Sequence, residues 1–164
     1  MIRKIFLVLL VLFLAIQFYP RPAKNTASAL SPNDITSKHA VPGNVQALLK
    51  ESCNDCHSNN TVYPWYSTIQ PVAWWLGGHI AEGKRKLNFS EFAGYSLRKQ
   101  YHKLEEVEEM VAEGEMPLPS YTIVHTSGKL TEEEKKVLID WSRQARAAMK
   151  ATYPADSLVS KKQG

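Results

Sequence analysis

Apolar residues in this chain recur at spacings that are typical of helices. The stretch LRKQYHKLEEVEEMVAEG (residues 97–114) predicts an amphipathic helix, because its apolar residues lie three or four positions apart. A second such helix begins at Thr131, where Thr-Glu-Glu-Glu forms a capping box ahead of Val137, Leu138 and Trp141. Alternating strand patterns are nearly absent. The pattern therefore predicts an all-α protein of four to five helices.

Two more helices are expected earlier in the chain. Asn44 is suited to cap a helix that runs directly into Cys53. Pro71 suits the first turn of another, in which Trp75 and His79 share one face. A loop with Met116 and two prolines then separates the helix of residues 97–114 from the last one.

The first twenty residues have a different character. Arg3 and Lys4 precede twelve consecutive apolar residues (5–16), the charged and apolar regions of an export signal. Such a run has no polar face, unlike a helix at the edge of a core. We expect an uncleaved N-terminal membrane helix that holds the protein at the periplasmic side of the bacterial inner membrane. Cleavage near Ala27–Ala29 would instead release a soluble periplasmic protein.

Composition divides the chain into four parts. Residues 1–20 form the expected membrane segment, and residues 21–43, rich in Pro, Ser, Asn and Thr, a flexible linker. Residues 44–150 form the folded domain and residues 151–164 a C-terminal tail. The net charge of +4 comes from scattered basic residues without a Lys/Arg stripe interleaved with aromatics, so nucleic acid is not an expected partner.

The chemistry of the chain is concentrated in CNDCH, residues 53–57, which holds its only two cysteines. Cys53 and Cys56 are three residues apart and His57 follows immediately. This arrangement is compatible with covalent haem attachment, with half of a zinc site, with a redox dithiol or with a short-loop disulfide. The rest of the sequence has to discriminate among these four.

Three of the four interpretations leave something unexplained. A zinc site needs two more ligands, but the remaining histidines are isolated in the sequence. A redox dithiol is expected at the start of a helix in a βαβ pattern, which is missing here. A disulfide would close a very short loop, which removes little entropy from the unfolded chain, and would leave His57 without a role.

Haem attachment uses all three residues. Two thiols at this spacing can each add to a vinyl group of the porphyrin, and the adjacent imidazole then binds the iron. Attachment of this kind takes place in the exported compartment that the N-terminus predicts. The sequence therefore predicts one haem c, covalently attached through Cys53 and Cys56 with His57 as an iron ligand.

The second axial ligand is predicted to be Met116. It lies in the proline-containing loop EGEMPLPSY, whereas Met110 and Met149 fall within predicted helices. His79 and His125 are the rival ligands, and a five-coordinate iron is the remaining alternative. Methionine–histidine ligation would raise the reduction potential of the haem.

Large aromatic residues are dense just after the attachment motif. Five of them, including Trp65 and Trp75, lie within residues 63–75. Core packing accounts for part of this density. Because haem is a large flat apolar group, we also expect Trp65 and Trp75 to help cover it, together with His79 on the same helix as Trp75.

The order of these elements is similar to that of small monohaem cytochromes c: attachment helix, covering loops, methionine loop and a closing helix with an aromatic residue. More specifically, residues 53–92, followed by MPLPSYTIVH and LTEEEKKVLIDW, resemble the haem-binding domain family of small exported bacterial proteins. The resemblance covers roughly residues 42–148. It implies that Cys53 and Cys56 attach haem c and that His57 ligates it, and it places His79 in the shared motif HIAEG. After His125 the chain departs from the pattern, reading TSGK instead of a Pro-x-Ala-like turn.

Together these features predict a membrane-tethered monohaem c-type cytochrome with an all-α, cytochrome c-like domain. It would pass single electrons to or from a periplasmic or membrane redox protein and would not be an enzyme. The alternative is a haem-based ligand-binding or sensor module, or a small peroxidase, with an open sixth iron position.

Overall fold

The computed structural model describes residues 1–159, and within this range the only regular secondary structure is helical, apart from one isolated β-bridge between Thr26 and Asn60. The all-α prediction is confirmed. The α-helices are α1 (Ile2–Ile16), α2 (Gly43–Ser52), α3 (Asn54–His57), α4 (Val72–Lys86), α5 (Leu97–Ala112), α6 (Pro119–Thr122), α7 (Glu132–Thr152) and α8 (Ala155–Leu158). Short 3-10 turns are η1 (Ile35–Ser37), η2 (Trp65–Thr68), η3 (Phe89–Gly94) and η4 (Thr126–Gly128).

The expected number of four to five helices behind the N-terminal segment was too low. Seven α-helices follow α1 in the described part of the chain. Three of them, α3, α6 and α8, are single turns of four residues. A single turn is too short to show the apolar periodicity on which the prediction rested.

The prediction of an N-terminal membrane helix is wrong. Helix α1 has 15 residues, and within residues 1–159 no helix combines the length and the apolar character that a membrane crossing requires. At 1.5 Å per residue α1 is about 22 Å long, short of the roughly 30 Å hydrocarbon layer. The helix ends where polar Gln17 turns to the domain and exchanges two hydrogen bonds with the backbone of Gln70, at 2.9 and 3.0 Å.

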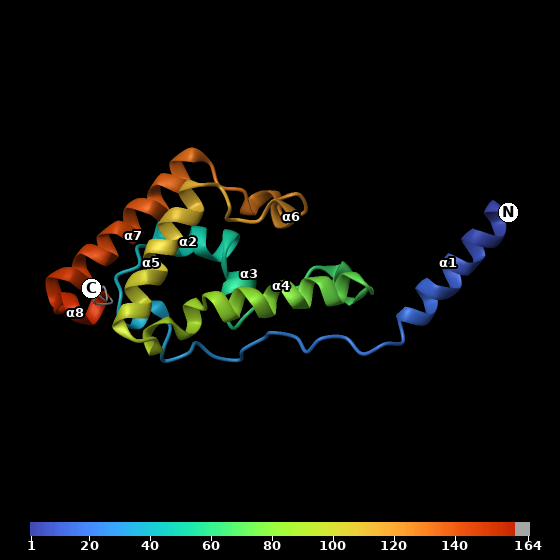
Figure 1. The fold of residues 1–164 in the computed structure, drawn as a ribbon, viewed down its shortest axis with the longest axis horizontal. Coiled ribbons are helices and arrows are strands. Elements are labelled where there is room, and N and C mark those ends of the chain that lie inside the picture. The colour runs from blue at the N-terminus through green and yellow to red at the C-terminus, as the bar shows by residue number, and fades with distance from the viewer. Residues whose placement is uncertain (160–164) are drawn as a thin grey trace, which may run out of the picture.

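The core of the domain lies between α5 and α7, which pack side by side (Figure 1). Phe92, Leu104 and Leu138 are almost completely buried there. Trp141 of α7 is buried too, and its indole N–H donates to the carbonyl of Ala40 at 3.0 Å. The core thus joins residues about a hundred positions apart in the sequence.

The capping box predicted at the start of α7 is present. The backbone N–H of Glu134 donates to the Thr131 hydroxyl at 3.2 Å, and the Glu134 carboxylate accepts from the Thr131 N–H at 2.8 Å. Both orphan donors at this helix end are thereby satisfied. This fixes where the long connection from α5 ends and α7 begins.

The other half of the domain is built from α2, α3, α4 and α6. Helix α3 packs against α4, while α4 and the segment with α6 extend from the α5–α7 body in the same direction (Figure 1). The candidate site lies between these two extensions and the body.

Residues 21–43, expected as a linker, lie along the domain. The Asn25 side chain donates to the carbonyl of Ser58 and to the Thr61 hydroxyl, both at 2.9 Å. Ile35 is buried in the core. In the expected tail, Leu158 of α8 is buried as well, and residues 160–164 lie outside the described part.

Candidate functional site

The CNDCH motif forms the turn from α2 into α3. Helix α2 ends at Ser52, and the carbonyl of Cys53 then accepts hydrogen bonds from the N–H groups of Cys56 (3.1 Å) and His57 (2.9 Å). This single turn holds the two thiols and the imidazole close together. Both cysteines are half-buried and are not joined by a disulfide.

Both thiols are protonated at neutral pH. Burial raises the pKa of Cys53 to about 12, with a further contribution from Cys56. Burial, and then the negative charge of Asp55, raise the pKa of Cys56 to about 11. Redox dithiols and zinc-binding cysteines act as thiolates and lie in surroundings that lower the thiol pKa. The environment of this pair has the opposite effect.

His57 is held in one tautomer by the end of α4. Its Nδ1 lies 3.1 Å from the carbonyl oxygen of Gly83 and 3.0 Å from that of Leu87. Because both neighbours are acceptors, Nδ1 must carry the proton and donate it, which leaves the lone pair of Nε2 free. Burial lowers the pKa of His57, opposed in part by these two hydrogen bonds. The ring is therefore neutral at pH 7.

Gly83 allows α4 to approach the motif this closely. A Cβ atom at this position would lie 2.6 Å from the carbonyl oxygen of Cys56 and 3.0 Å from its Cβ. No side chain fits in that space, so residue 83 has to be glycine. The sequence offered one signal that was not used: a glycine inside a helical pattern often marks a close approach.

Three connected hollows surround the motif. The central hollow (about 360 Å³) is lined by Cys53, Cys56, His57, His79 and Met116 among others. The inner hollow (about 400 Å³) shares Cys53, His57 and Met116 with it and reaches α5 and the core. The outer hollow (about 390 Å³) shares Cys56 and His79 with it and opens between α4 and α6. Each volume lies within the range of small-molecule and cofactor sites.

The structure brings together most of the predicted site residues. Met116 lines the central and inner hollows with His57, and its N–H donates to the carbonyl of Met110 at 3.1 Å. His79 lines the central and outer hollows and meets the Trp75 ring edge-on, with 4.4 Å between ring centroids.

The other two candidates lie farther out. Trp65 is 80% exposed on η2, where its ring packs edge-on against Tyr66, and it lines none of the three hollows. The structure therefore does not bring Trp65 to the site. His125, the rival iron ligand, lines the outer hollow only, stacked on Tyr121 with ring centroids 4.4 Å apart.

Sequence reasoning missed Tyr121 and Asp55. The Tyr121 hydroxyl lies 2.9 Å from Oδ2 of Asp55 and 3.0 Å from the carbonyl oxygen of Glu51. Burial and the charge of Asp55 raise the pKa of Tyr121, so this hydroxyl stays a donor. Nothing in the sequence around Tyr121 signals the contact, because its partners lie 66 and 70 residues away.

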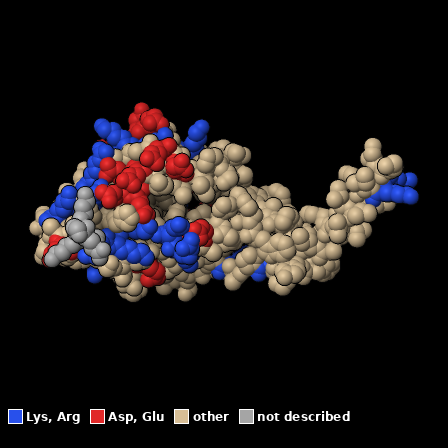
Figure 2. Space-filling view, in the orientation of Figure 1, with Lys and Arg blue, Asp and Glu red and all other residues tan. Residues whose placement is uncertain are grey.

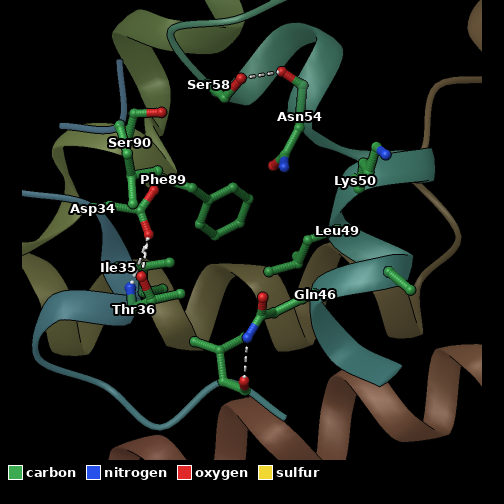
Figure 3. Close-up of a pocket in the computed structure, with 13 residues that line it drawn as sticks. Asp34, Ile35, Thr36, Gln46, Leu49, Lys50, Asn54, Ser58, Phe89 and Ser90 are labelled. Atoms are coloured by element: carbon green, nitrogen blue, oxygen red, sulfur yellow. Dashed lines mark hydrogen bonds between the residues drawn. The ribbon is translucent and has the colours of Figure 1, made fainter. Parts of the chain in front are cut away.

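The two residues between the cysteines point to different sides. Asp55 turns toward Tyr121, and its Oδ1 also accepts from the N–H of Val62 at 2.9 Å. Asn54 points into a separate hollow behind the motif, beside Phe89 (Figure 3). The Oδ1 atom of Asn54 is buried and has no hydrogen-bond partner in residues 1–159. A fourth hollow thus lies beside the motif, and it shares Leu49 and Phe89 with the inner hollow.

Charge is distributed unevenly around the site. Charged side chains gather over α5 and α7, whereas the end of the domain with α4 and α6 is largely uncharged on the face in Figure 2. Residues 61–81 and 116–128, which supply most walls of the outer hollow, contain no Asp, Glu, Lys or Arg. Lys86 and Lys103 line the inner hollow.

Comparison with known protein families gives one match. The family model described as a haem-binding domain matches residues 11–144, which include the CNDCH motif, the residues that line the central, inner and outer hollows, and most of α7. No curated protein and no solved structure shows significant similarity to the chain.

Proposed function

Since the chain belongs to the haem-binding domain family and binds haem, we propose that it holds this haem covalently, as haem c, and transfers single electrons. One observation carries the proposal. His57, whose Nδ1 is engaged and whose Nε2 lone pair is free, lines one hollow together with Cys53, Cys56 and Met116. These are the groups that covalent attachment and two axial bonds require.

The donor set fits haem c. When bound, haem supplies the one-electron chemistry through its iron. The thiols of Cys53 and Cys56 would each add across one vinyl group, the sulfur to one carbon and the proton to the other, so attachment would need no oxidant. The Nε2 atom of His57 is the one left to bind the iron, because Nδ1 is engaged by Gly83 and Leu87.

The surrounding residues suit an electron carrier. Met116 is the proposed sixth ligand, since it lies on the same two hollows as His57. Val107, Val111 and Leu138 make the inner hollow apolar and exclude water. Lys86 and Lys103 at this hollow are the cations that the propionate groups of haem would meet, and Glu82 and Glu106, their present partners, would compete for them.

Export is part of the same proposal. Covalent haem attachment requires delivery of the chain to the periplasm, and Arg3 and Lys4 ahead of the apolar residues of α1 are suited to direct it there. A periplasmic redox protein is then the proposed partner. Cell fractionation should recover the haem-containing protein from the periplasm; recovery from the cytoplasm would contradict this part of the proposal.

The rival proposal, a haem-based ligand-binding or sensor module or a small peroxidase, has one observation in its favour. The outer hollow adjoins Cys56 and His79 and has room for a small ligand. Carbon monoxide separates the two proposals. An electron carrier with His57 and Met116 on the iron should bind it slowly in the reduced state, and rapid binding by the wild-type protein would favour the rival.

Two sets of variants test the attachment and the ligand. In the Cys53→Ser/Cys56→Ser double variant, haem should no longer migrate with the protein on denaturing gels. Met116→Ala should retain attached haem and lose the near-infrared sulfur-to-iron band, whereas the matched change Met110→Ala should keep the band. Haem staining that survives the double change, or a band that survives Met116→Ala, would contradict the corresponding assignment.

A further inference from the structure

We propose that the hydrogen bond from Tyr121 to Asp55 is a latch. It holds the loop that carries Met116 closed over the site and limits the access of outside ligands to the iron. The covering loop is defined as residues 113–131, between α5 and α7. Tyr121 is a positioning residue in this proposal, which rests on the proposed haem c function. The latch explains how a long connection can present Met116 in a fixed place.

Between its two ends, the covering loop is joined to the rest of the domain by very few polar contacts. At its start, the N–H of Met116 donates to Met110 of α5. From residue 117 to residue 130 the backbone hydrogen bonds stay within the loop. In the described chain, the Tyr121 hydroxyl is the only group of residues 117–130 with hydrogen bonds to residues outside the loop. Leu130 anchors the end of the loop in the core, so the polar attachment of the segment before it depends on the Tyr121 side chain.

The Tyr121 ring also has a space shaped to receive it. A Cβ atom on Gly128 would lie 2.6 Å from Cε1 of Tyr121 and 3.0 Å from the carbonyl oxygen of Glu51. The ring thus reaches the end of α2 only because residue 128 has no side chain. The ring of His125 is nearly parallel to that of Tyr121, with 10° between the planes. Packing and hydrogen bonding fix the same side chain.

The latch connects the two axial ligands through the chain. Asp55 directly precedes Cys56 in the attachment turn, and Tyr121 lies five residues after Met116. Tyr121 lines the central and outer hollows, so it stands beside the site and not on a remote surface. Asp55 is itself fixed, because its other carboxylate oxygen accepts from Val62. Loss of the Tyr121 hydroxyl should therefore loosen the loop and leave the attachment turn in place.

Tyr121→Phe tests the latch in the full-length haem protein. A hydrogen bond to a charged group is among the stronger ones, so the rate of carbon monoxide binding to the reduced protein should rise by about tenfold or more. Covalent haem staining should not change. The matched control is Tyr63→Phe, because the Tyr63 hydroxyl accepts a hydrogen bond from the N–H of Asn25 at 2.7 Å and Tyr63 lines none of the three hollows.

The partner residue is tested by a double-variant comparison. If Tyr121 acts through Asp55, Asp55→Asn added to Tyr121→Phe should change the carbon monoxide rate by less than about twofold, since the interaction is already lost. Gly128→Ala, which displaces the ring while keeping the hydroxyl, should raise the rate in the same direction as Tyr121→Phe.

Hydrogen–deuterium exchange tests the latch without reference to the iron. Amides of residues 117–125 should exchange faster in Tyr121→Phe than in wild type, and Tyr63→Phe should leave them unchanged. Wild-type exchange in Tyr121→Phe would overturn the latch, as would equal carbon monoxide rates in the two tyrosine variants. If the wild-type protein shows no covalent haem staining, haem c attachment is overturned instead. The exchange measurement would still show whether the Tyr121 hydroxyl holds the covering loop.

Discussion

The two halves of this domain are built in different ways. Between α5 and α7, side chains such as Leu104 and Trp141 are buried and line none of the three hollows. Around α3, α4 and α6, three hollows of about 360 to 400 Å³ meet at the CNDCH motif. The first half is complete in the chain alone, whereas the second leaves a space of the size that a bound group occupies.

The contacts that hold the two halves also differ in kind. Arg146 of α7 bonds to Glu105 and Glu108 of α5 over an apolar interface, and Ser142 donates to the carbonyl of Leu104. Around the hollows, single hydrogen bonds hold the site, such as the one that the carbonyl of Gly83 accepts from His57 and the one from Tyr121 to Asp55. A change in the first half should therefore affect stability, and a change in the second should affect the site.

The largest effect is expected from a change in the core, which tests whether the two halves are separate. Leu104→Ala removes a fully buried side chain and should lower the free energy of unfolding by about 2–5 kcal/mol. Denaturant titration of the haem protein measures the change, with the exposed Leu30→Ala as a control that should have little effect. The near-infrared band should remain. A band lost together with the stability would mean that the halves are not separate.

A second test measures the reactivity of a thiol in the half that contains the site. In haem-free protein at pH 8, alkylation of Cys56 should be about a hundredfold slower than in the denaturant-unfolded chain, because the folded pKa of about 11 compares with an ordinary 9.0. The rate should rise with pH until about pH 11, as the thiolate forms. Fast alkylation at pH 8 with helical content retained would instead indicate an activated thiol.

The smallest effect is expected within the site, where α3 and α4 meet through a close backbone contact. Gly83→Ala forces a methyl group against Cys56 and should cost about 1–3 kcal/mol and reduce the yield of attached haem. A Cβ atom on Gly78 of the same helix would meet no neighbouring atom within 4 Å, so Gly78→Ala should be neutral or stabilise by up to about 1 kcal/mol. Equal effects of the two changes would show that the close approach at Gly83 is not required.

Sequence reasoning worked where a pattern is local. The periodicity in residues 97–114 and the capping box at Thr131 depend on neighbours within one or two turns, and both correspond to observed elements. The apolar run near the N-terminus led to the wrong prediction of a membrane helix. Its composition does not show that the helix ends at Ile16 instead of continuing to a membrane-spanning length. Single-turn helices leave no periodic pattern and were missed for that reason.

The same distinction applies to the site. The spacing of Cys53, Cys56 and His57 is itself local and could be identified in the sequence. The carbonyl of Gly83 that fixes the His57 tautomer lies 26 residues away, and Asp55 and Tyr121 lie 66 apart. Every residue has a backbone carbonyl, so an acceptor of this kind has no sequence signature. Only the packing of α4 and the covering loop reveals these partners.

The far end of α7 shows that the folded core of this chain extends beyond the part that matches the family. The match with the family ends at residue 144, yet Ala145, Met149 and Leu158 beyond it are buried in the same core. Helix α8 folds back onto α5 and α7 to cover them. A protein shortened to the matched region would expose one end of its interior to water. The boundary of shared sequence is therefore not the boundary of cooperative folding, which extends at least to Leu158.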